Sequence, residues 1–255
     1  MVFSLQKEAN FIKAIQEYKK THGRDFLYAM TKPKSKKAVF PSSVELPAIK
    51  DADVEEYERN VEKALKKHPE LYADFKDKFD GVEALIYRYD FWGYLEGNIS
   101  LSVHPDIKKN WKINHELFGA FYNVNLDNPY CSLFPDLEPG SEGSALLFKP
   151  EKGDIVLANP PYTDMWVSWT CRQILDKWRG KATFYVVIPG WDCKTKDELN
   201  MKDYRTCYYD IRELIENAKE YKFYKDFPFY NGITRKDYSF KKDRKKEVPI
   251  HVIKI

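Results

Sequence analysis

The chain has 255 residues, of which 43% are hydrophobic and 32% charged, as expected for a globular protein with one large domain or one domain and a sizeable appendage. Its formal net charge is +3, so any affinity for nucleic acid must come from local clusters of basic residues. No apolar run approaches the roughly 18 residues of a membrane span, and the polar, amphipathic amino terminus is not typical of a signal peptide. We therefore expect an intracellular protein, cytoplasmic or nuclear, that is not secreted and has no membrane partner.

The first part of the chain, residues 1–95, is predicted to form a helical domain. Apolar residues recur at helical spacing over residues 5–18, and helical periodicity returns over residues 51–94 with a break at His68-Pro69. The proline-containing residues 31–47 between them are expected to form a surface loop.

The second part, residues 96–255, is predicted to be an α/β domain with a largely parallel sheet. Short apolar runs separated by turn residues indicate strands, and helical periodicity lies between them, over residues 166–178 and 208–221. The last two strands lack an intervening helix, so we expect them to form an antiparallel edge. The expected strands cover residues 115–122, 130–134, 145–148, 154–158, 182–188, 221–224 and 250–255.

The cysteine pattern argues against both a metal site and a disulfide framework. Cys131, Cys171, Cys193 and Cys207 show no CxxC spacing and no nearby histidine pair. We therefore expect no metal and a reducing compartment.

Two features are compatible with nucleic acid, and each also has an ordinary structural explanation. Aromatic residues make up 16% of the chain, which fits base stacking or a core rich in Phe and Tyr. Two basic clusters fit phosphate binding or a solvated loop. The candidate phosphate ligands in these clusters are Lys34 and Lys36 in the first and Arg235 and Lys236 in the second.

The motif Asn159-Pro160-Pro161-Tyr162 directly follows the apolar residues 154–158, at the carboxyl end of a predicted strand, where open α/β sheets bind ligands. The alternative is a rigid turn with Tyr162 packed on the surface. The exocyclic amine of adenine is a poor nucleophile because its lone pair is delocalised into the ring. Two acceptors aimed at its N–H bonds, the Asn159 side-chain carbonyl and the Pro160 backbone carbonyl, would pull the nitrogen toward tetrahedral geometry.

The two prolines fix the backbone of this motif, so the acceptor carbonyl is held before the substrate arrives. Tyr162 then has the chemistry to stack on a base that is flipped out or single-stranded. The motif thus predicts an amino methyltransferase, with Asn159, Pro160, Pro161 and Tyr162 as its catalytic residues.

Further elements accompany the motif in chain order between about residues 81 and 192. They are Glu116-Leu117-Phe118-Gly119-Ala120 leading to Asn123, Tyr130-Cys131-Ser132-Leu133-Phe134-Pro135-Asp136, Gly140-Ser141-Glu142-Gly143 and Ile188-Pro189-Gly190-Trp191.

Together these elements resemble the family of the phosphorylated-CTD-interacting factor, the cap-specific adenosine N6-methyltransferases. The resemblance implies a Rossmann-like class I methyltransferase domain preceded by a helical domain, S-adenosylmethionine as the cofactor, and the first-transcribed adenosine beside the cap of mRNA as the methyl acceptor. Tyr162 stands where the animal proteins have Phe. The WW domain of the animal proteins is not expected in this chain, so recruitment by the polymerase tail is not expected either.

The cofactor contacts are predicted from their positions after the strands. Asp136 is the preferred ligand of the ribose hydroxyls, although a turn residue after Pro135 explains it equally well, and Asn123, Asn159 and Asp164 are further candidates.

Two other functions remain open. A DNA adenine methyltransferase needs a segment that reads duplex sequence, for which the helical part is small. A catalytically inactive, methyltransferase-like scaffold that binds RNA would be expected to have lost Asn159, which is present.

Overall fold

The computed structural model describes residues 5, 8–10, 12, 13, 16, 50–78, 80–95, 101–134, 137, 138, 140–190, 207–240 and 248–255. Contacts divide the chain into two compact units, Met1–Glu96 and Gly97–Ile255. Within the described ranges, no helix is both long and apolar enough to span a bilayer.

The first unit is helical in its described residues. The break expected at His68-Pro69 separates α3 (Asp51–Lys67) from α4 (Pro69–Phe75), because the proline ring fits only the first turn of a helix. A further helix, α5 (Val82–Phe91), begins after Gly81, whose φ of 80° ends the preceding turn. A buried ion pair of 2.6 Å joins Arg88 on α5 to Glu8.

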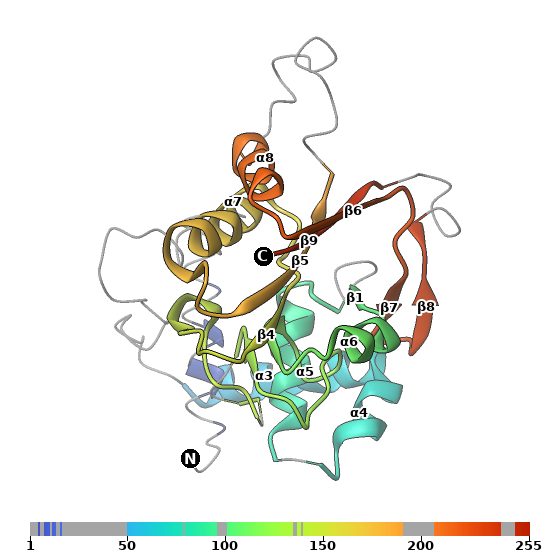
Figure 1. The fold of residues 1–255 in the computed structure, drawn as a ribbon. Helices are drawn as coiled ribbons and strands as arrows, with labels where there is room; N and C mark the ends of the chain where they lie inside the picture. Colours follow the sequence, from blue (N-terminus) through green and yellow to red (C-terminus); the bar gives the residue numbers. More distant parts are fainter. Residues whose placement is uncertain are drawn as a thin grey trace, which may run out of the picture. The chain divides into compact units, whose positions relative to one another are not determined.

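The second unit contains a six-stranded, mostly parallel sheet, which confirms the predicted α/β class (Figure 1). Its order is β3-β2-β4-β5-β9-β6; β9 pairs antiparallel with both of its neighbours, and the other pairs are parallel. The predicted antiparallel pairing of the last strand is therefore present, but β9 lies inside the sheet and β6 forms the edge. The strands are β2 (His115–Gly119), β3 (Tyr130–Ser132), β4 (Ile155–Ala158), β5 (Thr183–Pro189), β6 (Glu220–Tyr224) and β9 (Ile250–Lys254).

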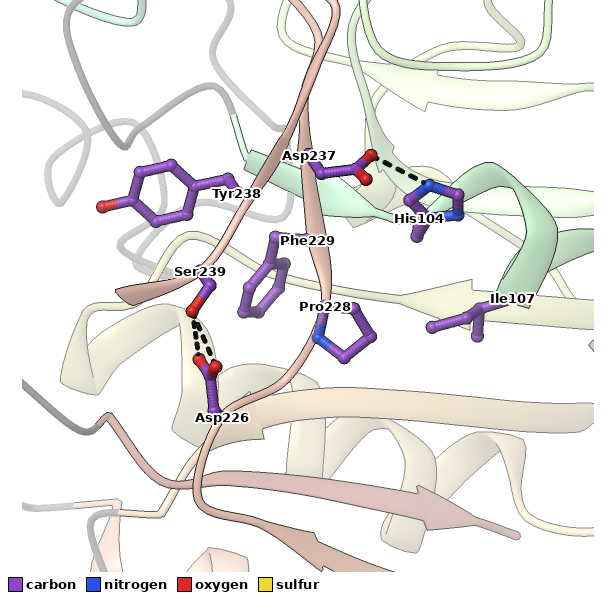
Figure 2. Close-up of a pocket in the computed structure, with 8 residues that line it drawn as sticks. All are labelled: His104, Ile107, Asp226, Pro228, Phe229, Asp237, Tyr238 and Ser239. Carbon is purple, nitrogen blue, oxygen red and sulfur yellow. Dashed lines mark hydrogen bonds and ion pairs between the residues drawn. The ribbon is translucent and has the colours of Figure 1, made fainter. Parts of the chain in front are cut away.

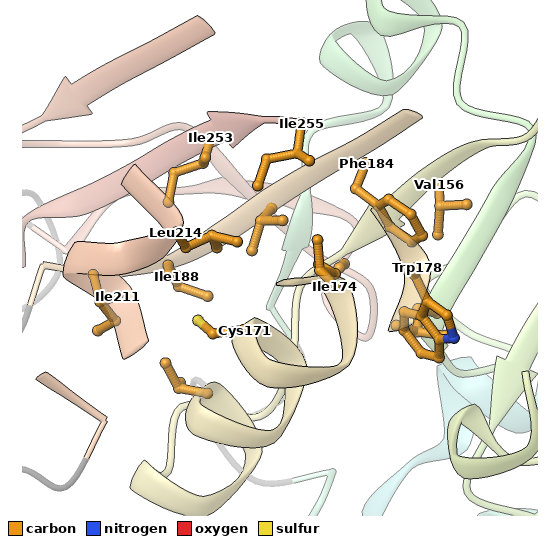
Figure 3. Close-up of a cluster of buried hydrophobic side chains, with 14 of the residues drawn as sticks. Val156, Cys171, Ile174, Trp178, Phe184, Ile188, Ile211, Leu214, Ile253 and Ile255 are labelled. Carbon is orange, nitrogen blue, oxygen red and sulfur yellow. The ribbon is translucent and has the colours of Figure 1, made fainter. Parts of the chain in front are cut away.

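Helices cover one face of this sheet. They are α7 (Asp164–Gln173), its π-helical continuation η5 (Ile174–Trp178) and α8 (Tyr208–Glu216). Side chains alternate between the faces of a strand, so Val156, Ile188 and Ile253 point to the helices and form a buried cluster with residues of α7 and α8 (Figure 3).

The opposite face is covered by the short helix α6 (Pro105–Trp111) and a small sheet. Val187 and Val252 of the large sheet pack there against Phe227 and Phe229. The small sheet is antiparallel, in the order β1-β7-β8, and its strands were not predicted from the sequence. They are β1 (Leu101–Val103), β7 (Phe229–Asn231) and β8 (Lys236–Tyr238).

The strand predicted at residues 145–148 is wrong. Residues Ala145–Leu147 form the 3-10 turn η4, and the Ser144 hydroxyl caps it by accepting a hydrogen bond from the Leu146 N–H. A side-chain cap of this kind favours a helical turn over an extended strand.

Candidate functional site

The carboxyl ends of β2 and β4 form the natural ligand-binding position of the sheet. The chain passes from β2 to β3 on one side and then to β4 on the other side, so the connections diverge between β2 and β4. These strands pair in parallel, with Glu116 beside Leu157. Ligands of open α/β sheets bind at such a point. The loops that begin here are residues 120–123 after β2 and residues 159–162 after β4.

The Asn159-Pro160-Pro161-Tyr162 motif forms a short turn between β4 and α7. The Pro161 carbonyl accepts a hydrogen bond from the Thr163 N–H at 2.8 Å, and the Thr163 hydroxyl caps α7 by accepting from Trp166 N–H. Among the described residues, no hydrogen bond reaches the Pro160 carbonyl. This carbonyl therefore remains an acceptor at the end of β4.

Tyr162, which was predicted to stack on a base, is hydrogen-bonded in the structure to Asn159. Its hydroxyl donates to Asn159 Oδ1 at 3.1 Å, and its half-buried ring packs edge-to-face on Phe229, 6.4 Å between centroids. Burial raises the pKa of Tyr162, so the hydroxyl stays protonated and remains a donor. A carbonyl oxygen has two lone pairs, so Asn159 Oδ1 retains room for a second donor.

The predicted cofactor residue Asn123 shapes the loop after β2. Its Oδ1 accepts a hydrogen bond from the Ala120 N–H at 2.9 Å, and its own N–H donates to the Ala120 carbonyl at 2.8 Å. The Asn123 backbone carbonyl accepts from Lys108 Nζ at 3.0 Å and from the Ser102 hydroxyl at 3.2 Å. Asn123 thus stabilises a tight turn through its hydrogen bonds to Ala120. Its own position is fixed by hydrogen bonds from Lys108 of α6 and Ser102 of β1.

Lys108, which binds the Asn123 carbonyl, also forms an ion pair with Glu116. Its Nζ lies 2.9 and 2.8 Å from the two carboxylate oxygens of Glu116 on β2, and both side chains are almost completely buried. A buried charge is tolerated only when it is paired and hydrogen-bonded. One lysine therefore joins α6, β2 and the loop after β2.

The small sheet contacts the same loop. Arg235, in the turn between β7 and β8, donates to the Tyr122 carbonyl at 3.1 Å. A Cβ added to Gly232 would lie 2.6 Å from that carbonyl oxygen, so only glycine fits there. Arg235, predicted to contact phosphate, is thus bonded to the loop, whereas Lys236 is exposed at the start of β8.

A buried carboxylate that the sequence did not single out also holds the loop. Glu138 is 4% exposed and accepts a hydrogen bond from the Phe121 N–H at 2.8 Å. Burial raises the pKa of the Tyr130 phenol on β3, and the neighbouring Glu138 charge and hydrogen bond add to that shift.

The first turn of α7 contains a buried donor with no partner. Among the described residues, the Trp166 indole N–H has no hydrogen-bond partner, although its ring is buried and packs edge-to-face on Phe118 of β2, 5.6 Å between centroids. Such a group costs about 1–3 kcal/mol when left unsatisfied. Asp164, the first residue of α7, accepts a weak hydrogen bond from the Cys207 thiol at 3.8 Å.

A pocket of about 350 Å³ lies beside this site (Figure 2). His104 Nε2 lies within hydrogen-bonding distance of Asp237 Oδ1, at 3.2 Å, on its wall, and the Ser239 hydroxyl donates to both carboxylate oxygens of Asp226, at 2.8 and 2.6 Å. Phe229 lines the pocket and also packs on Tyr162. The two carboxylates make this pocket unsuitable for phosphate.

Three of the predicted site residues, Asp136, Lys34 and Lys36, lie outside the described residues. The structure brings Asn123, Asn159, Pro160 and Tyr162 to one end of the sheet, with Asp164 one residue past the cap of α7. Across the ranges that the structure describes, no cluster of His, Cys, Asp and Glu has the makings of a metal site.

Replacing Lys108 with Met should lower the free energy of unfolding by about 3–5 kcal/mol, because the buried Glu116 carboxylate loses its partner. Urea denaturation measures this. Lys109→Met, an exposed neighbour on α6, is the control and should change stability by less than about 0.5 kcal/mol. The double variant Lys108→Met with Glu116→Leu should recover much of the loss. Equal stability of Lys108→Met and the wild type would contradict the role of this ion pair.

Comparison with protein families gives one match. The family model described as "Phosphorylated CTD interacting factor 1 WW domain" matches residues 66–226, which is more than half of the chain. A search of curated proteins gave no match.

We expected the core of this family without a WW domain, whereas the description of the matching model includes one. In its described residues, the matched range contains α4 to α8 and β1 to β6, and therefore both loops of the candidate site. The chain belongs to the family of phosphorylated CTD interacting factor 1.

Proposed function

We propose that this chain is an S-adenosylmethionine-dependent N6-adenosine methyltransferase that acts on RNA, at the first-transcribed adenosine beside the mRNA cap. The observation that carries the proposal is the position of Asn159 and Pro160 at the carboxyl end of β4, at the point where the strand connections diverge. Membership of the family supports the choice of reaction and acceptor.

The sheet supports a Rossmann-like methyltransferase domain. Its antiparallel strand β9 lies between β5 and β6, next to the parallel strands. An antiparallel strand at this end of the sheet is a feature of Rossmann-like methyltransferases. The helical unit that precedes this sheet in the chain supports the proposal of a helical domain before the methyltransferase domain.

The residues between β2 and α7 fit the cofactor. The cofactor carries a carboxylate and ribose hydroxyls, which can accept hydrogen bonds, and the buried Trp166 N–H has no acceptor within the part of the chain that the structure describes. The loop of residues 120–123 is held from several sides and presents a fixed wall. Trp166 and this loop would hold the cofactor, which when bound supplies a methyl group on a sulfonium sulfur.

Asn159 and Pro160 would act on the adenine amine. Their carbonyl oxygens accept its two N–H bonds, which draws the nitrogen lone pair out of conjugation and toward the methyl group. After transfer, the methylated nitrogen is acidic and loses one proton to water, so no side chain has to act as a base. By donating to Asn159 Oδ1, the Tyr162 hydroxyl would restrict rotation of the amide that accepts from the amine.

Nucleoside mass analysis tests the function as a whole. The wild type, S-adenosylmethionine and capped RNA that starts with A should yield N6-methyladenosine, while capped RNA that starts with G should yield none. Asn159→Ala should lower transfer by about 10²–10³-fold, as for loss of one oriented polar group. Asn217→Ala, at the end of α8, is the control. Methylation of duplex DNA instead would favour the DNA enzyme, and lack of cofactor binding would favour the inactive scaffold.

Tyr162→Phe tests the hydroxyl that orients Asn159. The ring and its packing remain, so we expect kcat to fall about 3- to 10-fold, the worth of one hydrogen bond, with KM for RNA unchanged. The effect should be modest because the animal proteins that the chain resembles have Phe here. Tyr162→Ala removes the ring as well and should lower kcat/KM further. An unchanged kcat for Tyr162→Phe would exclude the orienting role.

Trp166→Phe tests the unpaired donor. It should weaken S-adenosylmethionine binding about 10-fold in calorimetry, since a hydrogen bond to a charged acceptor is worth about 1.5 kcal/mol or more. In the cofactor-free protein, the loss of this N–H breaks no hydrogen bond among the described residues, so any fall in stability comes from the smaller buried ring. Trp169→Phe, whose ring contacts Trp166, is the matched control. Unchanged affinity for Trp166→Phe would show that its N–H does not contact the cofactor.

A further inference from the structure

The edge strand β6 presents two large aromatic side chains to solvent. Tyr221 is 44% exposed and Phe223 is 43% exposed, and β6 is the last strand of the six-stranded sheet. Edge strands are usually protected by charges or by a covering element, so an exposed aromatic pair on an edge requires an explanation.

The two rings lie on the same face of the sheet and are fixed there. Phe223 pairs with His251 of β9 and Tyr221 with Ile253. The His251 ring lies 5.6 Å from each aromatic ring, and the Tyr221 hydroxyl is 3.0 Å from His251 Nδ1. Residues two apart on a strand are about 6.6 Å apart, roughly twice the 3.4 Å rise per nucleotide in a stacked strand. Each ring can therefore take its own base.

The charge at both ends of this strand is positive. Lys219 and Lys225 flank it and are exposed, whereas the exposed Lys222 points to the opposite face of the sheet from the two rings. The acidic residue of the strand, Glu220, is paired with Lys254 of β9 at 2.5 Å. Over residues 219–225 and their partner Lys254, lysines thus outnumber acidic residues, as a phosphate backbone requires.

The direction of β6 connects this strip to the candidate site. β5 and β6 both run antiparallel to β9, so β6 is parallel to β4 and β5, and its carboxyl end lies at the same end of the sheet as Asn159. Three strand spacings separate β4 from β6, or about 14 Å. An RNA whose first nucleotide is at the β4 loop can reach β6 within a few nucleotides.

We propose that β6 is a platform for single-stranded RNA, on which Tyr221 and Phe223 stack with bases downstream of the modified adenosine while Lys219 and Lys225 contact phosphates. The choice of RNA rests on the proposed function. Stacking on exposed rings is tolerant of sequence, so the platform would retain transcripts of any sequence.

RNA binding without cap or cofactor tests the platform independently of methyl transfer. For a short single-stranded RNA in fluorescence anisotropy, Phe223→Ala should weaken binding about 5- to 150-fold, the loss of one stacked base, and Phe223→Trp should retain binding. Leu147→Ala, which removes an exposed side chain on η4, is the matched control and should bind as the wild type does.

The charges are tested in the same assay. Lys219→Glu with Lys225→Glu should weaken binding and reduce its dependence on salt. Lys152→Glu, an exposed lysine in the turn before β4, is the control. If Phe223→Ala, folded by circular dichroism, binds RNA as tightly as the wild type, the platform does not exist and a protein partner becomes the explanation of the exposed rings.

Acceptor length separates the platform from the proposed function. Phe223→Ala should raise KM for a capped RNA of some twenty nucleotides and leave KM for a cap dinucleotide unchanged, because the dinucleotide has no downstream bases. If the wild type transfers no methyl group but Phe223→Ala still weakens RNA binding, the proposed function is rejected and the RNA platform on β6 is supported. Equal KM changes for both acceptors would reject the platform.

Discussion

The parallel pairing of β2 with β4 is the constraint on which the candidate site depends. Because both strands run the same way and the chain leaves them in opposite directions, their following loops begin side by side at one end of the sheet. Asn123 comes from one loop and Asn159 from the other. The sheet therefore brings together polar groups that lie far apart in the sequence, and the rest of the second unit supports those two loops.

The loop after β2 is fixed by the protein itself. Asn123 closes it from within, Lys108 and Arg235 bind its carbonyls, and Glu138 binds its Phe121 N–H. Groups held in this way need no reorganisation when a ligand binds, so less binding free energy is lost in ordering the loop. The loop after β4 obtains similar rigidity from its prolines.

Features of the fold that depend on neighbouring residues could be predicted from the sequence. The α/β class and the helix break at Pro69 follow from apolar periodicity and proline chemistry, and the position of the Asn-Pro-Pro-Tyr turn follows from the apolar run before it. The small sheet was missed because its strands have three residues each, too few for periodicity to be visible. The apolar run that begins at Ala145 is compatible with a strand or a helical turn, and the cap by Ser144 that favours the turn is seen only in the structure. The role of Lys108 depends on a tertiary contact between α6 and β2, and that of Arg235 depends on a backbone carbonyl. No pattern in the sequence indicates that Lys108 contacts Glu116 or that Arg235 contacts the Tyr122 carbonyl.

The pairing of β1 with β7 determines when in folding the site can form. Leu101 lies opposite Asn231 in this antiparallel pair, although the two residues are far apart in the sequence. Contacts between residues so distant in sequence require closure of a long loop, which is entropically costly and slows folding. On the ribosome, the loop after β2 emerges long before Gly232 and Arg235, which complete its support. A nascent chain that ends before β7 would contain the whole Asn159-Pro160-Pro161-Tyr162 motif and would still lack the contacts of Gly232 and Arg235 with the loop after β2.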